Sequence, residues 1–373
     1  MSRETANLLR LISITAVLII HLTSPWELAF LKDHNYFSED FLASLMNQWA
    51  RFAVPVFVII SGYGLSKRYA KDGSFELGSF FKRRFVKIGL PFVVITIIIL
   101  LLNKKLTYNG ESDFGSNLVN IGNTLFTYFF KRGADYHFYF FTIILECYLF
   151  FPLLRRVNSG WFLLVLLLNQ LYFTSPSHLF IRDWGLYRPS FPSSFIAYWV
   201  FYFYLGIFWA KHEKKIKEKL AHIPQIITWL LLLATMALVM SEYVWWSYRL
   251  SGNANAKPDW YNHFHRWVVI VYAIVVVGFY IRFDKYIQGL LKDKYTGQVV
   301  AVATGLSFTV YIFHTWVLRG LRHTFFSYEV IILTVALVSA SFFMAHLLNL
   351  AVPFGWLRIL LGLPEQKLSS KKP

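Results

Sequence analysis

The chain has 373 residues, of which 56% are hydrophobic and 15% charged, and its formal net charge is +17. This composition excludes a soluble domain and indicates a membrane protein with several spans. The basic residues fall in clusters between apolar runs rather than along one surface, which argues against nucleic-acid binding. A single cysteine, Cys147, excludes a disulfide framework within the chain.

Ten apolar segments have about the length that crosses a bilayer. We predict spans at about 7–24, 45–66, 86–103, 136–154, 160–175, 193–211, 223–242, 265–282, 297–319 and 328–350. With the N-terminus inside, most Lys and Arg fall in inner loops, whereas outer loops carry carboxylates such as Glu27 and Asp40. We therefore predict an all-α polytopic membrane bundle of about ten transmembrane helices, with both termini cytoplasmic. Residues 1–355 would form the membrane domain and 356–373 a basic cytoplasmic tail.

The first segment carries two ionisable residues, Arg10 near its start and His21 near its far end, with ten residues between them. Eleven helical steps return a side chain almost to the same face and displace it by about 16 Å. Ionisable residues in a span face the bundle interior or a wet cavity by default. One stripe of this helix therefore places a cation near one membrane surface and an imidazole toward the other.

The second segment begins with Arg51 and contains Pro55 and Gly62. Proline in mid-helix frees a backbone carbonyl and permits a kink, so a kink that lines a cavity and ordinary packing around the glycine are both open. The loop that follows ends in FKRRFVKIGLP (81–91), which brings Arg83 and Arg84 to the inner mouth of the third span. Clustered arginine suits bidentate phosphate binding, but a topology signal with anionic lipid contact explains the same residues.

Two stretches on the outer side do not fit a plain row of spans. Residues 114–132 are apolar but interrupted by Gly122 and Asn123, which predicts an interfacial or re-entrant helix. Residues 173–192 include Arg182, Asp183 and Trp184, and such groups bind sugars by stacking and hydrogen bonding. An interfacial aromatic belt has the same composition, so both interpretations stay open.

Further ionisable groups lie in the fourth and ninth segments. His137 opens the fourth and Glu146 lies halfway along it, where a carboxylate must be protonated or paired. The ninth carries His314 toward its outer end, at the depth of His21 and His137. A lone membrane histidine usually has a packing role, whereas three at one depth, with cations at the opposite surface, indicate a site. We assign no metal ligands.

These motifs together resemble acyltransferase family 3 of integral membrane proteins. The motifs are the Arg10 and His21 pair, VPVFVIISGY at 54–63, the RR-containing segment 81–91, HFYF and YLFFPLL within 137–154, and SFTVYIFHTWVL at 307–318. The chain is most similar to short, single-domain bacterial members of the enterobacterial common antigen O-acetyltransferase type. It departs from many members in having Thr142 to Leu145 where they have paired acids, and Pro55 where they have one acid. No acidic catalytic role is therefore transferred.

The resemblance implies a multi-pass enzyme of the bacterial inner membrane. It would move an acyl group, most commonly acetyl, from cytoplasmic acyl-CoA to a hydroxyl of an extracytoplasmic surface glycan or lipid-linked saccharide. His21 would be the general base and His314 a second catalytic histidine. Cofactor-binding residues for the CoA donor would be Arg10, Arg83 and Arg84, and residues that orient the base or the substrate would be Arg51, His137, Tyr311 and Glu146.

The implied partners are acyl-CoA as donor substrate, the acceptor glycan and membrane lipids, with no tightly bound cofactor and homo-oligomerisation left open. Two other functions remain open at this point. One is a polysaccharide or glycolipid exporter without covalent chemistry. The other is a scaffolding subunit of a polysaccharide-synthesis complex.

Overall fold

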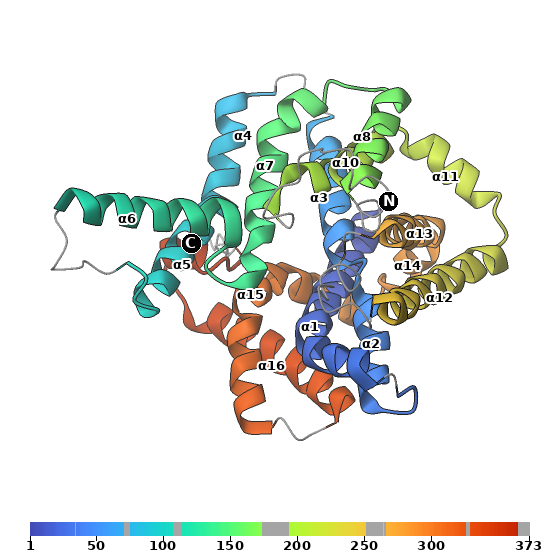
Figure 1. Ribbon diagram of the computed structural model, residues 1–373. Helices are drawn as coiled ribbons and strands as arrows, with labels where there is room; N and C mark the ends of the chain where they lie inside the picture. Colours follow the sequence, from blue (N-terminus) through green and yellow to red (C-terminus); the bar gives the residue numbers. More distant parts are fainter. Residues whose placement is uncertain are drawn as a thin grey trace.

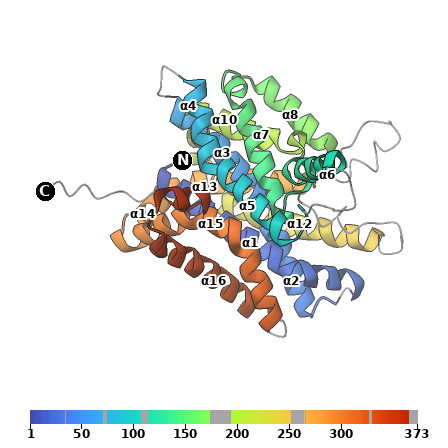
Figure 2. The same ribbon diagram turned by 90° about the vertical axis from the view of Figure 1, so that its left-hand side faces the viewer.

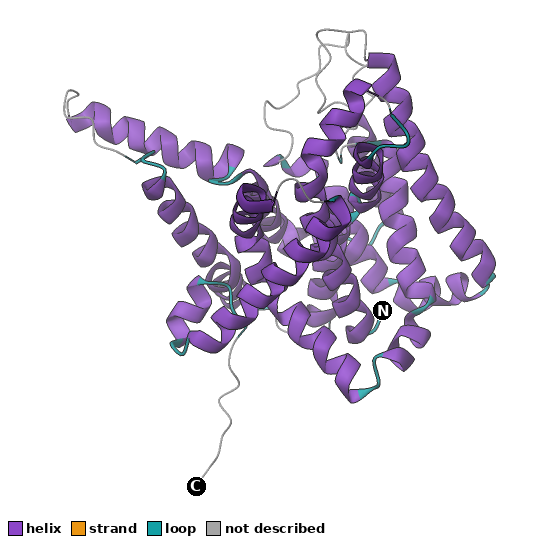
Figure 3. Cartoon of the chain, turned by 90° about the horizontal axis from the view of Figure 1, so that it is seen from below, coloured by secondary structure: helices purple, strands orange, loops and turns teal. Residues whose placement is uncertain are grey.

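The structure is a computed structural model that describes residues 1–33, 35–70, 75–106, 114–173, 194–250, 264, 266–325 and 329–364. All secondary-structure elements that these residues form are helices, and no strand is present among them (Figure 3). The predicted all-α class is therefore confirmed. The outer stretch predicted at 173–192 lies outside the described residues except for Phe173.

Seven helices of the described part are long and apolar enough to cross a membrane. They are α1 (Arg3–Asp33), α2 with α3 (Glu39–Ala50 and Ala53–Tyr69), α4, η1 and α5 (Leu77–Arg84, Phe85–Gly89 and Leu90–Leu102), η3 with α7 (Tyr136–Phe138 and Tyr139–Leu154), α12 (Gln225–Leu250), α15 (Lys294–Phe325) and α16 (Val330–Ala351). An eighth results if α13 (Trp267–Arg282) and α14 (Asp284–Leu290), bent by 62°, count as one span. These helices support a multi-pass membrane protein.

The other two predicted spans correspond to shorter apolar helices, α8 (Gly160–Phe173) and α10 (Val200–Lys211). They have too few residues to span a bilayer unaided. The predicted count of ten spans and the cytoplasmic placement of both termini therefore stay predictions. In the middle of the bundle, α1 contacts α2, α3, α15 and α16 (Figure 1).

The position predicted for Pro55 in mid-helix is wrong. The chain leaves the α-helix after Ala50 and re-enters it at Ala53. Pro55 thus lies in the first turn of α3, where backbone N–H groups have no partner within the helix. The break at Arg51 and Phe52 divides the predicted second span into two helices.

Helices α3 and α10 cross at two glycines. A Cβ atom on Gly62 would lie 2.1 Å from the carbonyl oxygen of Phe203, and one on Gly206 would lie 2.0 Å from that of Ile59. Backbone atoms cannot move aside as a flexible side chain can, so only glycine fits at either position. For the second predicted span, close helix packing is therefore the correct interpretation of Gly62.

Replacing Gly206 with valine is expected to lower the midpoint of thermal unfolding in detergent. The new side chain would force two backbones apart, and overpacking of this kind costs about 1–3 kcal/mol. Valine at Gly278, where a Cβ would meet nothing within 4 Å, is the matched control. Equal midpoints for the two variants would contradict the close approach of α3 and α10.

Helix α6 (Phe114–Phe126), followed by the π turn η2 (Thr127–Arg132), extends away from the bundle, to the left in Figure 1 and toward the viewer in Figure 2. It does not qualify as a span. Apolar side chains such as Leu118 and Phe126 are exposed on it. Its interfacial location stays a prediction.

After α16 the chain folds back on the bundle. The buried guanidinium of Arg358, in α17 (Gly355–Leu360), donates to the carbonyl oxygens of Asn349 and Val352 at 2.9 and 2.8 Å. The hydroxyl of Thr309 donates to the carbonyl oxygen of Gly362 at 2.9 Å, which ties this segment to α15. A separate cytoplasmic tail at 356–373 stays a prediction.

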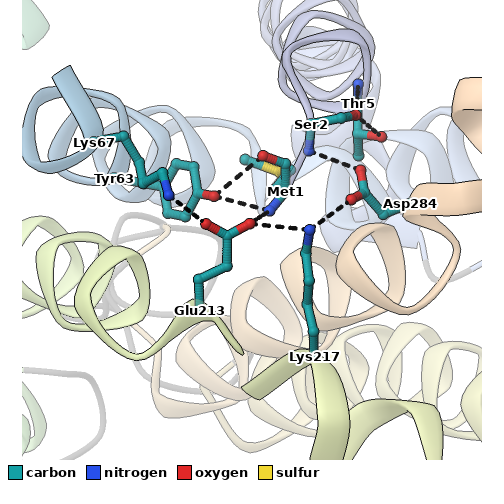
Figure 4. A network of polar contacts seen from close by, with 8 residues as sticks. All are labelled: Met1, Ser2, Thr5, Tyr63, Lys67, Glu213, Lys217 and Asp284. Carbon is teal, nitrogen blue, oxygen red and sulfur yellow. Dashed lines mark hydrogen bonds and ion pairs between the residues drawn. The ribbon is translucent and has the colours of Figure 1, made fainter. Parts of the chain in front are cut away.

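A network of ion pairs and hydrogen bonds lies at the end of the bundle at which α1 begins (Figure 4). Glu213, in α11 (Glu213–Ala221), pairs with Lys67 of α3 at 2.7 Å and with Lys217 at 3.0 Å. Lys217 also pairs at 2.9 Å with Asp284 of α14, which accepts a hydrogen bond from the backbone N–H of Ser2 at 2.8 Å. The network therefore joins α1, α3, α11 and α14.

This network makes stability depend on pH. Burial alone would raise the pKa of Glu213, but hydrogen bonds from Lys67, the Met1 amine and Lys217 lower it well below its usual range. A carboxyl group whose pKa is lower in the folded state stabilises the fold at pH values above its ordinary pKa. This stabilisation is lost as the pH falls toward the pKa of the folded state. We expect Glu213→Gln to lower the thermal midpoint at neutral pH and the deficit to shrink below about pH 4. Glu218→Gln, on the exposed face of α11, is the control, and a deficit independent of pH would contradict the assignment.

Candidate active site

Three imidazoles from separate helical elements meet toward the far end of α1. They belong to His21 of α1, His137 of η3 and His314 of α15. The ring centroids of His21 and His314 lie 5.2 Å apart in a stacked arrangement, and those of His137 and His314 lie 4.8 Å apart. The structure thus brings together the three histidines that the sequence analysis placed at one depth.

The three imidazoles differ in exposure. His137 and His314 are 1% and 0% exposed, whereas His21 is partly exposed. The Nδ1 atom of His314 lies 2.8 Å from the carbonyl oxygen of Tyr311, which can only accept, so this nitrogen carries a proton. The Nε2 atom of His314 has no hydrogen-bond partner in the described part of the chain. Of the three residues, His21 is therefore the least buried, and His314 stacks against its ring.

Asp135 anchors the η3 turn to α15 beside the histidines. Its Oδ2 accepts from the Thr315 hydroxyl at 3.0 Å and from Arg319 Nη2 at 2.8 Å, and its Oδ1 lies 3.9 Å from His137 Nδ1. The Tyr311 hydroxyl donates to the backbone carbonyl of His137. These contacts hold two of the three imidazoles in a fixed relation. Among the described residues, no group of three or more His, Cys, Asp or Glu is placed to hold a metal ion.

Arg51 belongs to a buried chain of charged groups. Its guanidinium donates to both carboxylate oxygens of Glu27, at 3.2 and 3.1 Å. Gln48 bridges Glu27 to Arg266, which pairs with Glu242 at 3.2 Å. All five side chains are at most 9% exposed, and their charges balance, which burial of ions requires. The chain joins α1, α2, α12 and the start of α13.

The outer-loop position predicted for Glu27 is wrong. Helix α1 continues past Pro25 to Asp33, so Glu27 is a buried helical residue. Its carboxylate neutralises Arg51, so Arg51 is held by an ion pair within the bundle. A role of Arg51 in orienting the base stays a prediction.

Three arginines and two tyrosines form a second cluster near the start of α1, away from the histidines. Arg84 lies with its guanidinium carbon 5.5 Å from the ring centroid of Tyr148, and Arg10 lies against α3, where a Cβ on Gly64 would be 3.6 Å from its Nη2. Arg83 donates to the Tyr69 hydroxyl at 3.4 Å. None of the three arginines forms an ion pair with a described carboxylate. Such cations suit an anionic ligand, above all a phosphate.

Glu146 joins neither cluster. It lies on α7 near the backbone of Ile196, and its Oε2 is buried without a hydrogen-bond partner in the described residues. Two residues of the clusters were not among the site residues predicted from the sequence, namely Tyr148 beside Arg84 and Arg322 beside His21. A signal existed for Arg322, because a cation at the outer end of a predicted span runs against the positive-inside rule.

One known family matches nearly the whole chain. The model of acyltransferase family 3, described as an acyltransferase domain, matches residues 4–351. The match includes both clusters, from Arg10 to His314. No curated protein and no solved structure matches.

Proposed function

The chain belongs to acyltransferase family 3, and from this premise we propose that it carries an acyl group from acyl-CoA to a hydroxyl of a surface glycan or glycolipid. The acyl group is most simply acetyl. The observation that carries the proposal is the placement of two clusters along α1, arginines without carboxylate partners near its start and histidines farther along. The start of α1 would face the cytoplasm of a bacterial inner membrane.

The arginine cluster would bind the donor. Arg10, Arg83 and Arg84 offer guanidinium groups that can each contact two phosphate oxygens. Tyr69 and Tyr148 hold two of them by a hydrogen bond and a ring contact. From Arg10 to His21 the helix rises about 16 Å. The extended arm of CoA is long enough to cover this distance. The thioester would thus reach the histidines while the phosphates stay at the first cluster.

The histidine cluster would carry out the transfer. A thioester is already activated, so the enzyme's main task is to remove the proton of the attacking hydroxyl. His21 would take that proton as the new carbon–oxygen bond forms at the thioester carbonyl. Collapse of the tetrahedral intermediate breaks the carbon–sulfur bond, and the imidazolium returns its proton to the CoA thiolate. His314 and Tyr311 would hold the base in place.

Mass spectrometry of surface glycans tests this proposal. We expect glycans from cells that lack the gene to be lighter by the mass of an acyl group, and complementation to restore that mass. The same mass difference identifies the acyl group. Unchanged acylation with glycan retained inside the cell would instead support the exporter. The family match favours the enzyme over both the exporter and the scaffolding subunit.

A further inference from the structure

A proline interrupts α1 one turn after His21. Pro25 lies inside the helix and has no backbone N–H, so it cannot donate to the carbonyl oxygen four residues earlier. That oxygen belongs to His21, the candidate base. A buried carbonyl that loses its helical donor needs another one, and a helix without this bond can bend at that point.

Arg322 supplies the missing donor. Its Nη2 donates to the carbonyl oxygen of His21 at 2.8 Å and to that of Leu22 at 2.9 Å. Arg322 lies on α15 eight residues after His314, which is about two helical turns. The helix that stacks an imidazole on the His21 ring therefore also holds the His21 backbone.

The charge and form of Arg322 suit this task. A guanidinium keeps its proton at any physiological pH and presents several donors in a rigid plane. The side chain is half-buried, and its Nε has no hydrogen-bond partner among the described residues. The two carbonyl oxygens are thus the hydrogen-bond partners that the structure gives this guanidinium.

We propose that Arg322 is a positioning residue that fixes the direction of the His21 imidazole by replacing the donor that Pro25 lacks. This inference rests on the proposed function, in which His21 is the base. General bases act only within hydrogen-bond reach of the proton that they remove, and a misplacement of about 1 Å costs roughly 100-fold in rate. In this role Arg322 acts through the backbone of α1, by its hydrogen bonds to the carbonyl oxygens of His21 and Leu22.

The test compares Arg322→Met in two backgrounds, native and Pro25→Ala, with the purified full chain in lipid nanodiscs. We expect Arg322→Met to lower kcat roughly 10- to 100-fold with KM for the acyl donor nearly unchanged. Arg322→Lys, which can still donate to both oxygens, should recover most of the rate. With alanine at position 25 the helix supplies its own N–H, so the loss caused by Arg322→Met should shrink to about 3-fold or less. Arg156→Met, at an exposed arginine, controls for loss of charge.

Three outcomes would overturn the inference. They are wild-type turnover in Arg322→Met, the same loss in both backgrounds, and a loss confined to KM. The midpoints of thermal unfolding are measured in parallel for the native chain, the two single variants and the double variant. This measurement does not depend on enzymatic activity. If the native chain transfers no acyl group, the proposed function fails, while a midpoint loss that Pro25→Ala relieves would still establish the Arg322 contact.

Discussion

Replacing His21 with alanine is expected to lower the rate of acyl transfer by about 100-fold or more, the loss typical of removing a general base. The variant keeps the arginine cluster, which lies about 16 Å away along α1, so donor binding should stay close to that of the native chain. The measurement is the release of CoA thiol from acyl-CoA in nanodiscs, with the acceptor glycan present. A fall in kcat at nearly constant KM is the expected pattern.

The control for this loss is another histidine of the same bundle. His323 is exposed on α15, so His323→Ala should leave turnover unchanged. Wild-type turnover in His21→Ala would refute the base assignment. His137→Ala and His314→Ala separate the other two imidazoles, because a residue that only orients His21 should cost less than the base itself.

Local helix geometry explains why the sequence predicts part of the site. The spacing of Arg10 and His21 translates into one stripe because the rise and rotation of a helix do not depend on its neighbours. The depth of His137 and His314 follows from hydropathy alone. Both predictions needed only the position of each residue along its own span.

Contacts between distant helices could not be predicted in this way. Glu27 lies two residues after a proline, and helices usually end near such a residue. Here α1 continues to Asp33, and the His21 carbonyl that Pro25 leaves without a helical donor accepts a hydrogen bond from Arg322, about 300 residues later in the chain. Likewise, a carboxylate inside the membrane needs a partner, and Glu242 is such a carboxylate. No pattern in the sequence identifies Arg266 as its partner. Such pairings are decided by the packing of helices, which a single sequence does not reveal.

Removing the arginines of the first cluster is expected to raise KM for acyl-CoA about 10- to 100-fold per residue, since hydrogen bonds to a charged ligand contribute about 1.5–3 kcal/mol. The changes are Arg10→Met, Arg83→Met and Arg84→Met, with kcat at saturating donor reduced far less. Lys82→Met, next to Arg83 but exposed, is the matched control and should leave KM unchanged. This pattern is the reverse of the one expected for His21, so the two clusters are distinguishable by kinetics.

A donor that lacks one phosphate makes the test specific. Acyl-dephospho-CoA lacks only the 3′-phosphate of the ribose and keeps the diphosphate. Replacing an arginine that binds the 3′-phosphate should therefore abolish the difference in KM between acyl-CoA and acyl-dephospho-CoA. Replacing an arginine that binds the diphosphate should weaken the binding of both donors equally. Each arginine of the cluster can then be assigned by its own double-mutant cycle of protein and substrate. If every variant discriminates between the donors as the native chain does, the arginines do not bind the ribose phosphate, and if KM also stays unchanged, they do not bind the donor at all.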